Sequence, residues 1–246
     1  MFTPTAFSSQ DIVRDGLVLW LDANDKTSYP GTGIVWRNLL GNGSNSELVN
    51  GPTFNDANGG FFTFDGVNEY SYIDNSSLTY NRSNFSVETW VKPTGNHSNY
   101  EVGAFSKWNT GAGTDNEFLL GFWNYSGPSP LWFSVQSPQN SGGFNGQGAF
   151  EVQSSFNYIV NQWYHLVGTF DGPNSTLKLY VDGVLVDTNT TFNDTQVKTT
   201  SIRYYIGAFG VRLSILASIS KCALYNKTLS SSEVLQNYNA LKDRYL

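Results

Sequence analysis

Before its last seventeen residues, this 246-residue chain contains no long stretch with helical periodicity. Instead, short apolar runs alternate with clusters of turn-forming residues, a pattern typical of an all-β sandwich or barrel. The composition agrees, because 17 Phe, 14 Tyr and 7 Trp favour strands while 24 Gly favour turns. The runs predict strands at residues 16–21, 61–64, 70–73, 85–91, 103–107, 117–123, 131–135, 163–170, 176–181, 184–187, 204–208 and 219–225.

The strongest local signal is the pair Asp182-Gly183, which separates two β-prone runs. Two-residue hairpins of type I′ require positive φ at both central positions, and Asp-Gly supplies them at low cost. A second turn of similar chemistry begins at Asp171-Gly172. The two turns predict a three-stranded meander over residues 163–187. In the run 85–91, Phe85, Val87 and Val91 share one face and Trp90 lies on the other, so both faces of that strand are expected to be covered.

The end of the chain changes its period. Ser230 and Glu233 form a capping box, in which each side chain bonds the backbone N–H of the other residue. An apolar stripe follows at helical spacing: Val234, Leu235, Tyr238, Leu241 and Tyr245. The pattern predicts one amphipathic helix over 231–244 that packs on the sandwich. Residues 1–15 are polar and are expected to form an arm or linker, which leaves one domain over 16–246.

Charge and cysteine content exclude several classes of protein. With 20 acidic and 14 basic residues the net charge is −6, and no cluster of Lys and Arg suggests a nucleic-acid binder. No window approaches the ~20 apolar residues of a membrane span. A single cysteine, Cys222, allows neither an internal disulfide nor a cysteine-based metal cluster. The first residues lack the basic and apolar regions of a signal peptide.

Three groups of motifs resemble the concanavalin A-like, laminin G-like jelly-roll family. The first comprises residues 16–23 (GLVLWLDA), 28–31 (SYPG), 36–39 (WRNL) and 64–70 (FDGVNEY). The second comprises 85–93 (FSVETWVKP), 163–172 (WYHLVGTFDG) and 179–183 (LYVDG). The third comprises 219–230 (ISKCALYNKTLS) and 233–245 (EVLQNYNALKDRY). Together they cover residues 16–246, and the opening and closing phrases resemble the form of this domain found in virion structural and fibre proteins of tailed phages, especially marine ones.

The resemblance implies two curved antiparallel sheets packed face to face, with ligands bound at loops or on the concave face. It also makes Asp65, in the sequence Phe-Asp-Gly, the candidate ligand for a calcium ion, since relatives often hold a cation near this loop. Calcium takes six to eight oxygen ligands, so further groups would be needed. Many relatives carry Asp where this chain has Ser220, which removes one anionic ligand. The alternative is that Asp65 organises a turn, and no cofactor is required.

Paired or triad catalytic groups are missing from the sequence. A retaining glycosidase needs two carboxyl groups about 5 Å apart, as in a Glu-x-Asp-x-x-Glu strand, and no such spacing occurs. Glu88 stands alone among uncharged neighbours, while Asp115 and Glu117 lie where a loop enters a strand. His97, His165 and Cys222 lack the neighbours of a nucleophile–base pair, and packing accounts for His165 and Cys222. We therefore expect a protein that is not an enzyme.

Aromatic residues beside Asn, Asp and Gly point to sugar recognition, in which rings stack on C–H patches and polar groups bond hydroxyls. The candidate glycan-binding residues are Trp108, Asp115, Asn116, Trp123, Tyr125 and, in the glycine-rich segment 140–148, Phe144. Core packing is the alternative for the tryptophans and the favoured one for Trp132. A mobile loop without a specific role is the alternative for 140–148.

The leading hypothesis is a non-enzymatic virion structural protein: a capsid decoration, fibre or tail-appendage module, synthesised in the host cytoplasm and displayed on the virion surface. Its expected partners are other capsid or tail proteins and a host-surface glycan, and we expect a homo-oligomer or many copies per particle, because arrayed copies turn weak contacts into avidity. The alternative is a carbohydrate-binding, lectin-like module, cellular or viral.

Overall fold

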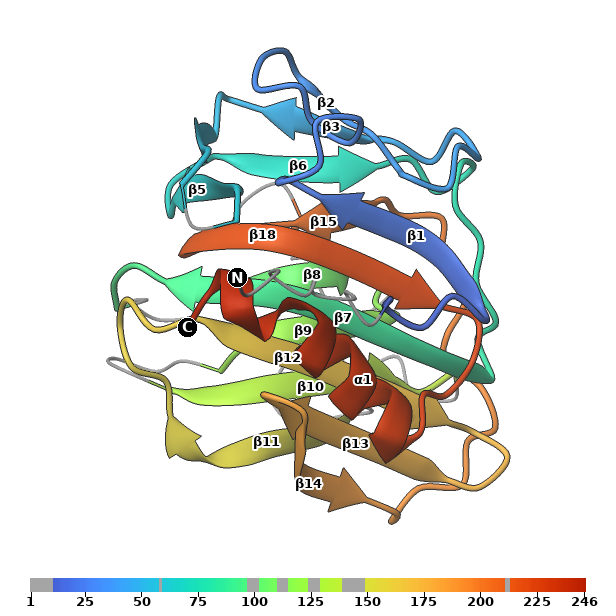
Figure 1. Ribbon diagram of the computed structural model, residues 1–246. Coiled ribbons are helices and arrows are strands. Elements are labelled where there is room, and N and C mark those ends of the chain that lie inside the picture. The colour runs from blue at the N-terminus through green and yellow to red at the C-terminus, as the bar shows by residue number, and fades with distance from the viewer. Residues whose placement is uncertain are drawn as a thin grey trace, which may run out of the picture.

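The computed structural model describes residues 11–57, 59–96, 102–109, 115–123, 129–138, 149–210 and 213–246. In these residues the chain forms two eight-stranded antiparallel sheets packed face to face, with one α-helix on the outside of the first sheet (Figure 1). The all-β sandwich with a short C-terminal helix is therefore confirmed. No helix in this part of the chain is long and apolar enough to cross a membrane.

Sheet A carries the helix. Its strand order is β14 (Val184–Asn189), β13 (Thr176–Val181), β12 (Tyr164–Asp171), β7 (Asn84–Pro93), β18 (Leu216–Tyr225), β5 (Phe61–Asp65) and β4 (Thr53–Asn55), and β1 (Leu17–Asp22) also pairs with β18. Helix α1 (Ser231–Leu241) crosses the front of β7, β12 and β13 (Figure 1) and continues as a 3-10 turn, Lys242–Arg244.

Sheet B lies behind it. Its order is β11 (Ala149–Asn157), β10 (Pro130–Gln136), β9 (Phe118–Phe122), β8 (Val102–Lys107), β15 (Tyr204–Ile206), β6 (Tyr70–Ile73), β3 (Ser46–Val49) and β2 (Val35–Trp36). A small ribbon of β16 (Ala208–Phe209) and β17 (Leu213–Ser214) follows β15. The sequence pattern does not predict β2, β3, β4, β11, β16 or β17, because these strands are two to four residues long or, in β11, largely polar.

The predicted meander is confirmed, since β12 pairs with β13 and β13 with β14 in antiparallel register. Its turn has φ of 52° at Asp182 and 79° at Gly183, as the type I′ hairpin requires. Leu166, Leu179 and Val181 are buried between the sheets together with Phe85 and Val87. This core positions both outer faces of the sandwich.

The space beneath α1 is a second core. The capping box of Ser230 and Glu233 is present, and the helix buries Val234, Leu241 and, beyond it, Tyr245. Trp163 is buried here rather than between the sheets, in one cluster with Trp90 and Tyr245. The predicted stripe is wrong at Leu235, whose side chain is 45% exposed.

The N-terminal segment is packed as well. Ile12 and Val13 are buried, and the backbone N–H of Val13 donates to Asn237 of α1 at 2.8 Å. Packed structure therefore begins before Gly16, within the segment that the sequence suggests is an arm. The physical reason is apolar burial, because Ile12 packs in one cluster with Trp90 and Leu241, and Val13 packs in another with Val234.

Candidate functional site

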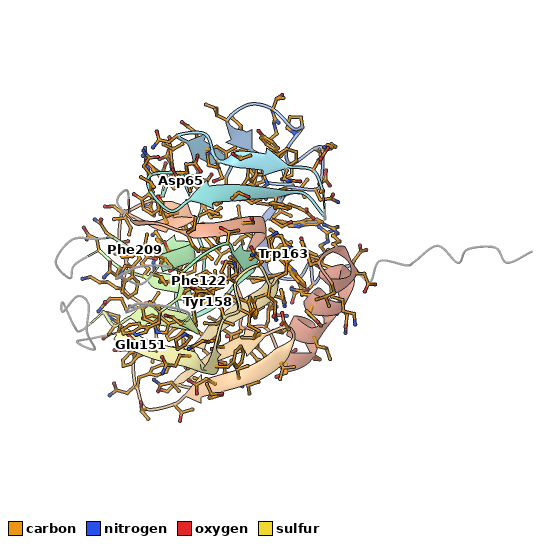
Figure 2. All side chains as sticks on the ribbon, turned by 90° about the vertical axis from the view of Figure 1, so that its left-hand side faces the viewer. Asp65, Phe122, Glu151, Tyr158, Trp163 and Phe209 are labelled. Atoms are coloured by element: carbon orange, nitrogen blue, oxygen red, sulfur yellow. The ribbon has the colours of Figure 1, made fainter. Side chains whose placement is uncertain are left out.

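The two outer faces of the sandwich differ in what they expose. Helix α1 covers the outside of sheet A. The face of sheet B that points away from sheet A, here called the outer face of sheet B, lies on the side of the molecule opposite the helix. Figure 2 shows the sandwich from the side: Trp163 lies towards α1, Phe122 and Tyr158 between the sheets, and Phe209 and Glu151 on the far side.

Three tyrosines gather on the outer face of sheet B. Alternation along β6 buries Ser71 and Ile73 and leaves Tyr70 and Tyr72 half-buried on the outer side. Tyr205 of β15 is the register partner of Tyr72, and its ring centroid lies 6.0 Å from that of Tyr70. The Tyr70 and Tyr72 centroids are 6.5 Å apart. We call Tyr70, Tyr72 and Tyr205 the tyrosine row.

Charged side chains border the tyrosine row. The guanidinium of Arg203 lies 4.0 Å from the Tyr72 ring centroid, and its Nε donates to Asp74 at 2.8 Å. Glu47 of β3 is the register partner of Tyr72 on the other side. Burial, and then the neighbouring Glu47 carboxylate, raise the pKa of Tyr72. The row thus combines apolar ring surface with exposed acceptors and donors.

Trp108, predicted to bind sugar, and Trp132, predicted to pack, lie elsewhere on the same face. Trp108 and Trp132, each 3% exposed, form an apolar cluster with Leu119 and Phe209. The β16–β17 ribbon lies on β8 here: Gly210 N donates to Trp108 O at 2.9 Å. Gly103 permits this approach, because a Cβ atom at that position would stand 2.8 Å from the carbonyl oxygen of Ala208. Packing therefore occupies the rings of Trp108 and Trp132.

The other predicted glycan residues are distributed unevenly. Asp115 is exposed, whereas Asn116 is buried and accepts from Asn109 N at 3.0 Å. Trp123 is half-buried, with its ring edge-on to Trp132 at 4.9 Å. Tyr125, Phe144 and the histidine at position 97 lie outside the described residues. The structure thus brings Trp108 and Trp123 together around Trp132.

Asp65 occupies an exposed turn after β5. Its Oδ1 accepts from the N–H groups of Val67 (2.8 Å), Asn68 (3.1 Å) and Glu69 (3.3 Å). Burial is the largest single influence and raises the pKa of Asp65, but the backbone hydrogen bonds together outweigh it and hold the pKa below its ordinary value. In return, Glu69 Oε2 accepts from Asp65 N at 2.9 Å. The two carboxylates organise a turn.

Calcium fits this turn poorly. Asp65 Oδ1 already accepts three N–H groups, and among the described residues no three Asp, Glu, His or Cys side chains converge. Ser220 donates to the carbonyl oxygen of Gly60 at 2.5 Å and lies 2.7 Å from the Tyr245 hydroxyl. It thereby ties the end of the chain to the β4–β5 region.

Two carboxylates without an obvious partner in the sequence prove to be buried in ion pairs. Glu88 Oε1 lies 2.6 Å from Lys221 Nζ and 3.2 Å from His165 Nε2, beneath α1. Glu117 pairs with Lys107 and accepts from the Tyr80 hydroxyl at 2.5 Å. All six side chains are buried, and each carboxylate faces a lysine ammonium. These groups hold the fold together and are out of reach of a substrate.

The tyrosine row was not predicted from the sequence, although one signal was available. The runs Tyr70-Ser-Tyr-Ile and Tyr204-Tyr-Ile each place tyrosine at outward positions of a predicted strand. What joins them is the pairing of β6 with β15, two strands more than 100 residues apart in the chain. The local sequence of either strand does not predict a pairing between strands so far apart in the chain.

Comparison with known proteins identifies the fold. Residues 65–235 match the family model of the concanavalin A-like lectin/glucanases superfamily. No curated protein matches the chain in sequence. Among solved structures, domain 4 of AbnA, a GH43 extracellular arabinanase from Geobacillus stearothermophilus solved with arabinotriose, superposes with a TM-score of 0.64 at 17% identity, over 90% of this chain and 98% of that domain.

Other similar structures are parts of larger chains. The binding domain of Paraclostridial Mosquitocidal Protein 1 has a TM-score of 0.67 at 16% identity, over 92% of this chain and 52% of that chain. Trypanosoma rangeli sialidase in complex with sialic acid has a TM-score of 0.62 at 16% identity, over 93% and 33%. At these identities the likeness shows a shared fold.

Proposed function

Because this chain belongs to the concanavalin A-like lectin/glucanase superfamily, we propose that it is a non-enzymatic, lectin-like module that binds carbohydrate on the outer face of sheet B. One observation carries the proposal: the half-buried rings of Tyr70 and Tyr72 lie beside Arg203, Asp74 and Glu47. Tyrosine rings offer apolar surface to sugar C–H groups, while carboxylates accept from hydroxyls and a guanidinium donates to them.

Similar structures support this class of function. Domain 4 of the arabinanase was solved with arabinotriose, and the part of the mosquitocidal protein that was solved is a binding domain. Because the fold is shared, the binding roles of those proteins support a binding role for this chain.

The absence of catalysis is part of the proposal. Of the carboxylates considered from the sequence, Glu88 and Glu117 are buried in ion pairs, and Asp65 and Glu69 are bonded to the backbone of their own turn. Beside the tyrosine row, Asp74 is paired with Arg203, which leaves Glu47 as the carboxylate there that is not held by this arginine. Glycoside hydrolysis needs a carboxyl pair placed on either side of an accessible bond. We propose binding without turnover.

We also propose that the module sits on a virion surface, as a capsid decoration, fibre or tail appendage. The support is the resemblance of residues 16–23 and 233–245 to phrases of phage structural proteins. A weak site suits such a location, because many copies on one particle raise the overall affinity. Quantitative mass spectrometry of purified particles tests this location, and a chain missing from the particles would refute it.

Glycan-array binding by an artificially multimerised form tests the binding function. An aromatic contact is worth ~0.5–1.5 kcal/mol beyond its buried area, so Tyr70→Ala should weaken binding about two- to tenfold, while Tyr70→Phe should retain most of it. The matched control is Phe156→Ala, which removes a ring that is 43% exposed on β11, outside the tyrosine row.

Three results would contradict the proposal. Loss of binding in Phe156→Ala equal to that in Tyr70→Ala would move the site away from the row. Release of reducing sugar from a bound polysaccharide would show an enzyme. Absence of binding to every glycan, with the multimer folded, would leave a structural module.

A further inference from the structure

We infer that the tyrosine row selects uncharged glycans and disfavours acidic ones, an inference that rests on the function proposed above. It follows from the balance of charge on the side chains that touch the row. Three charged groups act on Tyr72: Glu47, Arg203 and Asp74. Together they carry one positive and two negative charges, so one negative charge is in excess.

Arg203 is the cation that an acidic sugar would need, and it is already engaged. Its Nε donates to Asp74 at 2.8 Å, while its guanidinium lies 4.0 Å from the Tyr72 ring centroid. A carboxylate or sulfate entering here would compete with Asp74 for the same guanidinium. Displacing Asp74 would leave a second unpaired carboxylate beside Glu47 and the incoming anion.

Glu47 supplies the uncompensated negative charge. It is exposed on β3, opposite Tyr72 in the sheet register. Arg203, the cation beside the row, is paired with Asp74 rather than with Glu47. An ionised carboxylate only accepts hydrogen bonds, so Glu47 favours ligand hydroxyls and opposes ligand anions.

The size of the selection follows from exposure. Arg203 and Asp74 are 45% and 55% exposed, so water and salt screen their fields. One net negative charge at a distance of one sugar ring should therefore change affinity about three- to tenfold. The preference should shrink as NaCl is added, because screening weakens repulsion between exposed charges.

Matched glycan pairs provide the test. The multimerised chain is applied to an array on which each neutral galactose-terminated oligosaccharide stands beside its sialylated and its sulfated form. We expect about three- to tenfold stronger binding to the neutral member. Glu47→Gln should narrow the ratio of neutral to acidic binding, because it removes the negative charge and keeps a carbonyl acceptor, whereas Asp243→Asn, which removes an exposed carboxylate on the α1 side, should leave that ratio unchanged.

The possible outcomes distinguish a failure of the charge selection from a failure of the proposed glycan-binding function. Equal or stronger binding to the acidic members that depends on Tyr70 would overturn the charge selection and leave the glycan-binding function intact. A preference for neutral members that Glu47→Gln does not alter would also overturn it. Binding to neither member would refute the proposed function and this inference with it.

Discussion

Asn237 connects four parts of the fold, and its replacement gives the sharpest test of how the helix is held. Its side chain is fully buried. Nδ2 donates to Glu88 Oε2 on β7 at 2.5 Å and to the Tyr225 hydroxyl on β18 at 2.9 Å. Oδ1 accepts from Val13 N at 2.8 Å. Asn237→Ala therefore removes three hydrogen bonds at once.

The expected cost follows from the groups left behind. An unsatisfied buried polar group costs ~1–3 kcal/mol, and Asn237→Ala strands a carboxylate oxygen, a hydroxyl and a backbone N–H. Water entering the small cavity would recover part of this loss. We expect the free energy of unfolding to fall by about 4 kcal/mol, which for a chain of this length lowers the melting temperature by roughly 10 °C.

Urea unfolding followed by tryptophan fluorescence and circular dichroism measures the effect. Asn239→Ala is the matched control, since Asn239 lies two residues away on the same helix but is exposed. Its side chain bonds Lys242 at the surface, and its loss should change stability by less than about 0.5 kcal/mol. Trp90, one of seven tryptophans, contributes to the fluorescence change when the helix leaves the sheet, because Tyr238 of α1 stacks on it with ring centroids 5.8 Å apart.

The comparison of the two variants decides the outcome. If Asn237→Ala loses less than about 1 kcal/mol, the buried network does not anchor the helix, and apolar packing alone holds it. If the melting transition splits while the core transition stays in place, the helix unfolds separately from the sandwich.

Three further predictions concern charge, thiol chemistry and metal. Burial alone would raise the pKa of Glu88, but Lys221 and His165 hold it well below its ordinary 4.5. The ionised Glu88 therefore contributes its full stabilisation above pH 4.5, and this stabilisation is lost as the pH falls further. When the free energy of unfolding is measured against pH, it should decline less on acidification in Glu88→Gln than in the wild type. Burial raises the pKa of the Cys222 thiol to about 12, so a thiol reagent at pH 8 should label it only after denaturant is added, and rapid labelling of the native protein would contradict its burial. EDTA or added calcium should leave the melting temperature unchanged, because Asp65 Oδ1 already accepts hydrogen bonds from backbone N–H groups. A melting temperature that rises with calcium would show that ligands beyond that turn bind the ion.

Local sequence determined the elements whose signals lie within a few residues. The Asp182-Gly183 turn sets the hairpin, because its positive φ values depend on those two residues alone. The Ser230 and Glu233 box begins the helix for the same reason. Alternation along β7 correctly placed Trp90 on the face opposite Phe85, and the aromatic and glycine content pointed to an all-β sandwich.

The burial of Trp108, one of the predicted sugar-binding residues, was decided by tertiary structure. The sequence predicts that Trp108 lies in a loop, yet the β16–β17 ribbon packs Phe209 against its ring. That contact depends on residues about 100 positions apart and on the absence of a side chain at Gly103. An aromatic residue has the same pattern whether it packs or binds, so sequence leaves both roles open.

The tyrosine row and the pairing of Glu88 also depend on the complete fold. Tyr72 meets Tyr205 because β6 pairs with β15, and Glu88 meets Lys221 because β7 pairs with β18. Within its own strand, each of these residues shows only which face it occupies. The partner across the sheet comes from a distant strand, whose register is set by the burial of the whole inner face rather than by either residue.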